Sequence, residues 1–138
     1  MQMQQKMRVE KQVMSKARWL YVILGLVIMM ALGTVYSWSV FRLPVEVLYD
    51  VGTAQSGLPY MTALLFYSLF MFLTGRFFKD WSPRKTILTG TLLVSVGWIL
   101  SAFAPNIQTL PIAYGVISGA GGGVAYGAPL TVVTRWFP

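Results

Sequence analysis

The sequence predicts an all-α membrane protein with four transmembrane helices. Of its 138 residues, 56% are hydrophobic and only 11% are charged, whereas about a quarter of the residues in a soluble domain are charged. The charges are also unevenly spread, because residues 19–41, 51–75 and 86–134 contain none. Crossing roughly 30 Å of hydrocarbon takes about 20 apolar residues, and a helix satisfies its own backbone polar groups.

Each uncharged segment predicts its helices in turn. The first predicts a helix over about 19–41, and the second predicts one over about 54–78 with a bend at Pro59. The third segment is long enough for two helices, over about 86–104 and 110–135, because residues 104–108 interrupt it with a turn. Pro111 then falls in the first turn of the fourth helix, where its missing N–H costs nothing.

The basic residues predict the orientation of the helices. Of the 11 Lys and Arg, all but Arg42 lie before the first helix, between the second and third helices, or at the end of the fourth. This positive-inside pattern predicts a multi-pass protein of the plasma or inner membrane with a cytosolic N terminus. Residues 19–138 then form the helical domain. Residues 1–18 form a cytosolic basic tail, either an amphipathic helix on the membrane surface or an unstructured orienting segment.

The composition also excludes several classes of function. The chain has no His and no Cys, so we expect no zinc site, no thiol nucleophile, no other metal site and no cofactor. Serines such as Ser37 and Ser101 have no His or buried acid nearby in the sequence to activate them, so we expect no enzyme. The net charge of +7 is explained by the basic connections, so we expect no nucleic-acid partner.

Glycines recur at every fourth position of the fourth predicted helix. They are Gly115, Gly119, Gly123 and Gly127. This spacing makes a bare ridge that lets another helix approach closely, which matters in a membrane because lipid supplies no hydrophobic drive between helices. A helix this rich in glycine also suits bending during transport, or a ligand close to its backbone.

A tyrosine motif occurs in both the first and the fourth helix. Gly33 and Tyr36 are followed by Ser37, and Gly123 and Tyr126 are followed by Gly127. We take the midpoints of the two helices near Met30 and Gly122. At 1.5 Å per residue, Tyr36 then lies about 9 Å from the membrane midplane toward the outside, and Tyr126 lies about 6 Å from it toward the cytosol. Inverted repeats place a binding site between such elements, where each tyrosine offers a ring face and a hydroxyl. The alternative is a chance match between two packing tyrosines.

These motifs resemble the oxalate:formate antiporter family of the major facilitator superfamily, and the resemblance covers nearly the whole chain. It is carried by Arg18, Trp19 and Tyr21; by Gly33, Tyr36, Ser37 and Trp38; by Pro44, just after the first predicted helix; by Gly97 and Trp98; by Gly119, Ala120, Gly121, Gly123, Tyr126 and Gly127; and by Arg135, Trp136, Phe137 and Pro138.

The resemblance implies a secondary active transporter that exchanges small carboxylate anions across the lipid bilayer by alternating access. It also implies a twelve-helix fold of inverted three-helix repeats, of which this chain is an N-terminal fragment, so the missing C-terminal helices are expected partners. Tyr36 and Tyr126 match family positions that line the substrate cavity. Trp38 is a third candidate for substrate binding, and its alternative role is in the outer interfacial belt. Gly33 is expected to pack helices together, like the glycines of the fourth helix.

The basic connection at residues 75–85 resembles the superfamily's gating loop between helices 2 and 3. Gly75, Asp80, Arg84 and Lys85 carry this likeness, although Asp80 is displaced by one position and Ser82 stands where the family has a turn glycine. The resemblance implies a latch that differs between conformations. The alternative is a solvated basic loop that only orients the protein.

Two other functions fit a chain of this length. One is a complete four-helix transporter that acts as a homo-oligomer, but such proteins use a membrane-embedded acid in their first helix, and residues 19–41 contain none. The other is a membrane scaffold subunit that does not transport and binds a partner helix through its glycine ridge.

Overall fold

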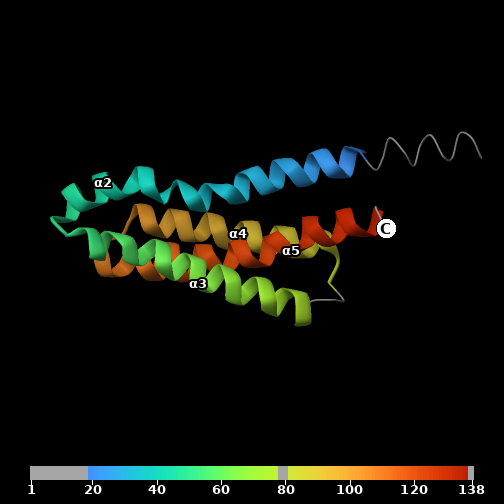
Figure 1. Ribbon diagram of the computed structural model, residues 1–138. Helices are drawn as coiled ribbons and strands as arrows, with labels where there is room; N and C mark the ends of the chain where they lie inside the picture. The colour runs from blue at the N-terminus through green and yellow to red at the C-terminus, as the bar shows by residue number, and fades with distance from the viewer. Residues whose placement is uncertain (1–18, 78–80, 137–138) are drawn as a thin grey trace, which may run out of the picture.

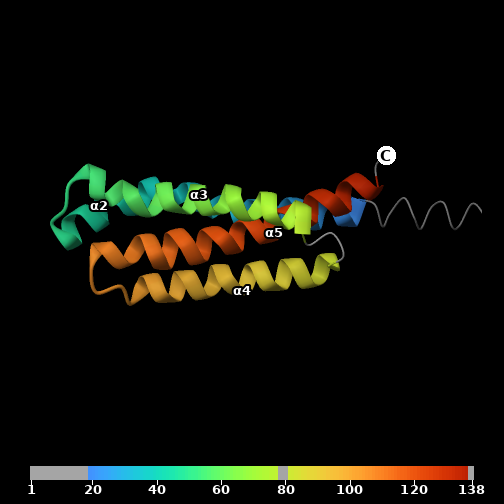
Figure 2. The ribbon, with the colours of Figure 1, turned by 90° about the horizontal axis from the view of Figure 1, so that it is seen from below.

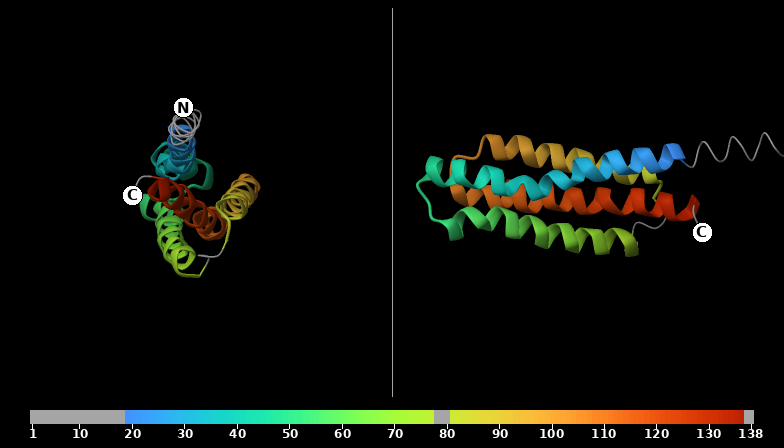
Figure 3. Two further views of the ribbon diagram at one scale, coloured as in Figure 1. Left: turned by 90° about the vertical axis from the view of Figure 1, so that its right-hand side faces the viewer. Right: turned by 45° about the horizontal axis from the view of Figure 1, so that its top comes forward.

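The computed structural model describes residues 19–77 and 81–136, and these residues form helices joined by short turns. The helices lie side by side along one axis and alternate in direction (Figure 1). The start of the first helix and the end of α5 lie at the same end of the bundle, together with the end of α3 and the start of α4 (Figure 3). The fold class predicted from the uncharged segments is confirmed. The tail at residues 1–18 lies outside the described residues.

The first helix is continuous from Trp19 to Tyr49. It is α-helical over 19–32, tightens to a 3₁₀-helix in η1 (Gly33–Ser37), and continues as α2 (Trp38–Tyr49). It therefore extends well past the predicted end near residue 41, and Pro44 lies inside it. The reason is local, because the Nε atom of Arg42 donates to the Glu46 carboxylate one turn later at 3.0 Å, so the charge that suggested a boundary is paired within the helix.

The next two helices lie close to their predicted positions. α3 (Thr53–Phe77) contains Pro59, and α4 (Pro83–Ala102) begins a few residues earlier than predicted. Ser82 explains the early start of α4. Its hydroxyl accepts a hydrogen bond from the backbone N–H of Lys85, and the following proline suits the first position of a helix.

The fourth predicted helix consists of two segments with different helical pitch. After the 3₁₀ turn η2 (Ile107–Thr109), a π-helix η3 (Pro111–Ser118) runs directly into α5 (Gly119–Trp136), and Pro111 opens the π-helix. The first helix, α3 and α4 are each long and apolar enough to cross a membrane. η3 and α5 together run the length of the bundle between α3 and α4 (Figure 2).

The glycines of η3 and α5 allow the backbone of α3 to approach closely. A Cβ atom added to Gly119 would lie 2.6 Å from the carbonyl oxygen of Ala63, closer than real Cβ contacts allow. One turn away on either side, a Cβ on Gly115 would meet Thr62 and a Cβ on Gly123 would meet the carbonyl oxygen of Tyr67. The glycine ridge therefore packs against α3, as small-residue spacing predicts.

Gly127 and Gly33, the other two glycines predicted to pack helices together, have more space around them. A Cβ on Gly127 would make only an ordinary contact, 3.8 Å from Thr74, and a Cβ on Gly33 would meet no atom within 4 Å among the described residues. Gly33 therefore makes no close helix contact among the described residues, and its packing role stays a prediction. A second line of close contacts joins α4 to η3 and α5 instead, at Gly90 and Gly97.

Thr74 is a buried polar side chain whose hydroxyl oxygen is fully enclosed and has no partner among the described residues. It is 7% exposed, and its hydroxyl makes no hydrogen bond. Valine has the same shape without the hydroxyl, so Thr74→Val is expected to raise the free energy of unfolding by about 1 kcal/mol. Thermal unfolding in detergent would measure the change. The control is Thr89→Val, which removes an exposed hydroxyl bonded to the Lys85 carbonyl. A loss of stability in Thr74→Val would contradict the assignment.

Candidate functional site

An aromatic cluster holds the first helix against the rest of the bundle. Trp38 is 6% exposed, its indole N–H donates to the carbonyl oxygen of Ser56 at 2.9 Å, and its ring lies 4.6 Å from that of Tyr114. Trp98 packs edge-on against both Tyr114 and Phe41. Trp38 therefore lies in the core of the bundle rather than in an exposed interfacial belt.

Three tyrosines from three helices lie near one another. The rings of Tyr67 in α3 and Tyr126 in α5 meet edge-on, with centroids 5.7 Å apart. Tyr67 also lines a small cavity together with Thr34 and Val35, the two residues before Tyr36. We call Tyr36, Tyr67 and Tyr126 the tyrosine triad. The two tyrosines singled out by the repeated motif thus gather around a third that the motif did not reveal.

Tyr36 has an unusual setting for a tyrosine in a membrane helix. It is 64% exposed on the surface of the described bundle, and it lies near the centre of the helix Trp19–Tyr49 rather than at either end. Membrane tyrosines that face lipid are enriched at the two interfaces, where the hydroxyl reaches water. A central, exposed tyrosine therefore suits a surface that faces a polar path or another helix.

The 3₁₀ and π segments meet at the aromatic cluster. The hydroxyl of Tyr114, in η3, donates to the carbonyl oxygen of Val35, in η1, at 3.3 Å. Both segments depart from α-helical hydrogen bonding, and such departures within long helices often mark hinges or functional sites. Neither departure was visible in the sequence pattern.

A small cavity of about 30 Å³ lies beside this junction. The first helix, α3, α4, η3 and α5 all contribute to its wall. Its lining residues are Ala31, Leu32, Thr34, Val35, Tyr67, Val94, Trp98, Tyr114, Ser118 and Gly122.

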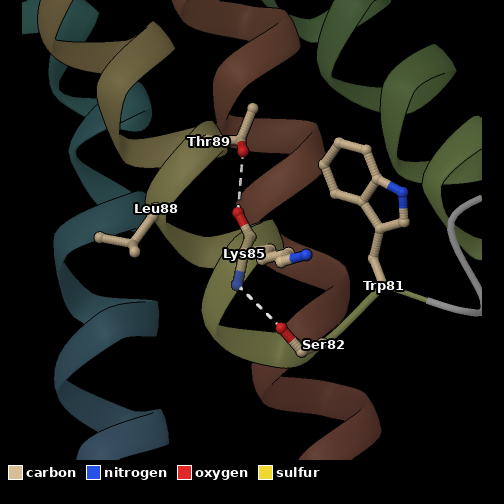
Figure 4. Close-up of a pocket in the computed structure, with 5 residues that line it drawn as sticks. All are labelled: Trp81, Ser82, Lys85, Leu88 and Thr89. Atoms are coloured by element: carbon tan, nitrogen blue, oxygen red, sulfur yellow. Dashed lines mark hydrogen bonds between the residues drawn. The ribbon is translucent and has the colours of Figure 1, made fainter.

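The described part of the predicted gating loop lies at the opposite end of α4 from this junction. Trp81, Ser82, Lys85, Leu88 and Thr89 line an open hollow at the start of α4 (Figure 4).

Of the predicted gating residues, Gly75, Arg84 and Lys85 are exposed, and Asp80 lies outside the described residues. Arg84 and Lys85 occupy the first turn of α4, where the helix dipole disfavours cations. The charges of Arg84 and Lys85 therefore do not stabilise α4.

A polar network at the other end of the bundle ties α2 to α3. The Ser56 hydroxyl donates to the Glu46 carboxylate at 2.6 Å, and the same carboxylate oxygen accepts from Arg42. The one basic residue of the first helix within the described part is therefore already paired.

Comparison with known proteins identifies the class to which the chain is similar. It is 25% identical over 123 residues to YhjX, an uncharacterized MFS-type transporter of Escherichia coli (strain K12), a match that covers 89% of this chain and 31% of that protein. It is 28% identical over 122 residues to the oxalate:formate antiporter of Oxalobacter formigenes, covering 88% of this chain and 29% of that protein. These relatives are membrane transporters. No family model matches the chain.

A third relative matches a shorter segment of the chain at a higher sequence identity. Monocarboxylate transporter 14 of Mus musculus is 43% identical over 63 residues, which are 46% of this chain and 12% of that protein. The resemblance expected from the sequence motifs is confirmed by these relatives, which are transporters rather than enzymes. Together with the apolar helices, they identify the chain as a multi-pass membrane protein. It spans 31% and 29% of the lengths of the first two relatives.

Proposed function

We propose that this chain is part of a secondary active transporter that carries small carboxylate anions by alternating access, with oxalate and formate as the first substrates to test. The observation that carries the proposal is the similarity over 88% of the chain to an oxalate:formate antiporter. We further propose that it resides in the plasma or inner membrane with a cytosolic N terminus, as the positive-inside pattern favours.

The charges of the chain support the view that other helices complete the site. A carboxylate that leaves water for a low-dielectric cavity needs fixed cations to offset its desolvation. The uncharged segments 19–41, 51–75 and 86–134 supply none, and Arg42 is already paired with Glu46. The cations must then come from helices beyond these four. The tyrosine triad supplies hydroxyls and ring faces to the path that the carboxylate follows through the protein.

The isolated chain is therefore expected not to exchange oxalate for formate. Proteoliposomes loaded with unlabelled formate would be assayed for uptake of labelled oxalate. A chimera in which this chain replaces the matched segment of the Oxalobacter formigenes antiporter is expected to restore uptake. Exchange by the isolated chain would contradict the proposal and favour a complete four-helix transporter. A well-folded chimera that carries no carboxylate would contradict the substrate class.

The tyrosine triad can be tested in the same chimera. Tyr36→Phe and Tyr126→Phe each remove one hydroxyl, and a hydrogen bond to a charged group contributes roughly 1.5–3 kcal/mol, so we expect an increase in KM of about tenfold or more. The control is Tyr60→Phe, a half-buried tyrosine of α3 outside the triad. An unchanged KM in both triad variants would remove these hydroxyls from the substrate path.

A further inference from the structure

The small cavity beside the 3₁₀ and π segments contains polar side chains that the packing leaves without partners. Ser118 lines the cavity and is 8% exposed, and its hydroxyl makes no hydrogen bond to any described residue. Other serines of these helices do bond to their own backbone: Ser68 donates to the Leu64 carbonyl and Ser101 to the Gly97 carbonyl. Ser118 is thus a donor without a partner on the wall of this cavity.

Further hydroxyls surround the same space. Tyr67 lines the cavity, and its hydroxyl makes no hydrogen bond within the described part of the chain. Thr34 and Tyr114 line it too, and they donate to the carbonyls of Ala31 and Val35, so their hydroxyl oxygens remain able to accept a hydrogen bond. A small guest that both donates and accepts would satisfy Ser118 and Tyr67 at once.

The size and charge of the cavity identify that guest. Its volume of about 30 Å³ is enough to hold a water molecule, and a buried water typically makes about three hydrogen bonds to groups that would otherwise be unsatisfied. The rest of the wall is apolar and includes Leu32, Val94 and Trp98. A volume of about 30 Å³ leaves no room for a carboxylate with its several heavy atoms.

We propose that this cavity is a binding site for one ordered water molecule held by Ser118 and Tyr67. The water lies where η1 of the first helix meets η3, and it supplies the hydrogen bonds that these two hydroxyls lack. The site therefore hydrates a junction between the first helix and the rest of the bundle. This inference does not depend on which solute the protein carries.

Radiolytic labelling can detect such a water in the full chain reconstituted in lipid nanodiscs. X-rays generate hydroxyl radicals from bound water as well as from bulk water, and the radicals oxidise nearby aromatic rings. Tyr114 is 2% exposed and lines the cavity, whereas Trp38 is 6% exposed and does not. In buffer free of carboxylates, Tyr114 is expected to be oxidised several-fold faster than Trp38. Equal slow oxidation of the two residues would overturn the proposal.

Two variants and one added solute identify what holds the water. Ser118→Ala keeps the Cβ that packs on Gly97 and removes only the hydroxyl, so it is expected to reduce Tyr114 oxidation to the level of Trp38. Ser95→Ala, at an exposed serine bonded to the Thr91 carbonyl, is the control and is expected to change nothing. If Ser118→Ala does not fold, Val94→Ile fills the cavity from α4 and carries the same expectation.

Unchanged oxidation of Tyr114 in a folded Ser118→Ala or Val94→Ile variant would overturn the assignment. Added oxalate is expected to leave the ratio of Tyr114 to Trp38 oxidation unaltered. Selective protection of Tyr114 by oxalate would show that the cavity takes an anion, and would overturn the water site while leaving the proposed transport intact.

Discussion

Gly119→Ala is expected to lower the free energy of unfolding of the bundle by about 1–3 kcal/mol or more. The substitution places a methyl group against backbone atoms of α3, which cannot move aside as a flexible side chain could. The new Cβ would lie 2.6 Å from the Ala63 carbonyl oxygen and 2.9 Å from the Ala63 Cα. Ala63 is fully buried, so α3 and α5 must move apart along their contact. Loss of packing is costly in a membrane, since packing is what holds the helices together. Thermal unfolding in detergent would measure the effect as a large drop in Tm.

The matched control for this variant is Gly57→Ala in α3. A Cβ at Gly57 would meet no atom within 4 Å among the described residues. Alanine favours a helix over glycine by about 1 kcal/mol, so this variant is expected to keep or slightly raise the Tm. Equal Tm values for Gly119→Ala and Gly57→Ala would show that α3 and α5 do not pack as closely as described.

Trp38→Ala is expected to release the first helix from the bundle. Truncating a buried aromatic residue costs about 3–5 kcal/mol in soluble proteins, and here it would also remove the donor to the Ser56 carbonyl and the ring contact with Tyr114. Limited proteolysis and thermal unfolding in detergent would detect the change. Val40→Ala is the control, because Val40 lies two residues along the same helix and is 71% exposed.

Trp38→Phe separates packing from hydrogen bonding at this position. It retains an aromatic ring and loses the N–H, so its stability is expected to fall between that of Trp38→Ala and that of the unaltered chain. If Trp38→Ala unfolds at the same temperature as Val40→Ala, Trp38 does not anchor the first helix, and its role must be sought in the substrate path instead.

The charge pattern predicted the membrane-spanning architecture well, because a charge inside a bilayer is so costly that a long segment without charges strongly indicates a membrane span. The same reasoning placed the end of the first helix too early. Arg42 suggested a boundary, but a carboxylate one turn later pairs with it, and the helix continues past Pro44 to Tyr49. A single charge with a partner four residues away is a weaker boundary than an isolated one.

The candidate site was only partly predictable. The repeated motif pointed to Tyr36 and Tyr126 but not to Tyr67, whose ring meets that of Tyr126. A signal for Tyr67 did exist, since Pro59, Ala63 and Tyr67 follow one another at four-residue spacing on α3 and the carbonyls of all three face the glycine ridge. The 3₁₀ and π segments had no comparable signal, because they depend on how the helices settle against one another rather than on local propensity.

The central position of α5 has a consequence for biosynthesis. α3 and α4 both pack extensively on η3 and α5, while among the described residues they make few contacts with each other. A ribosome delivers the chain from its N terminus, so α3 and α4 enter the bilayer before the segment that joins them has been made. Until Gly115 and the residues after it emerge from the translocon, the earlier helices have little to hold them in register. A nascent chain arrested before that point should remain open to membrane chaperones and proteases.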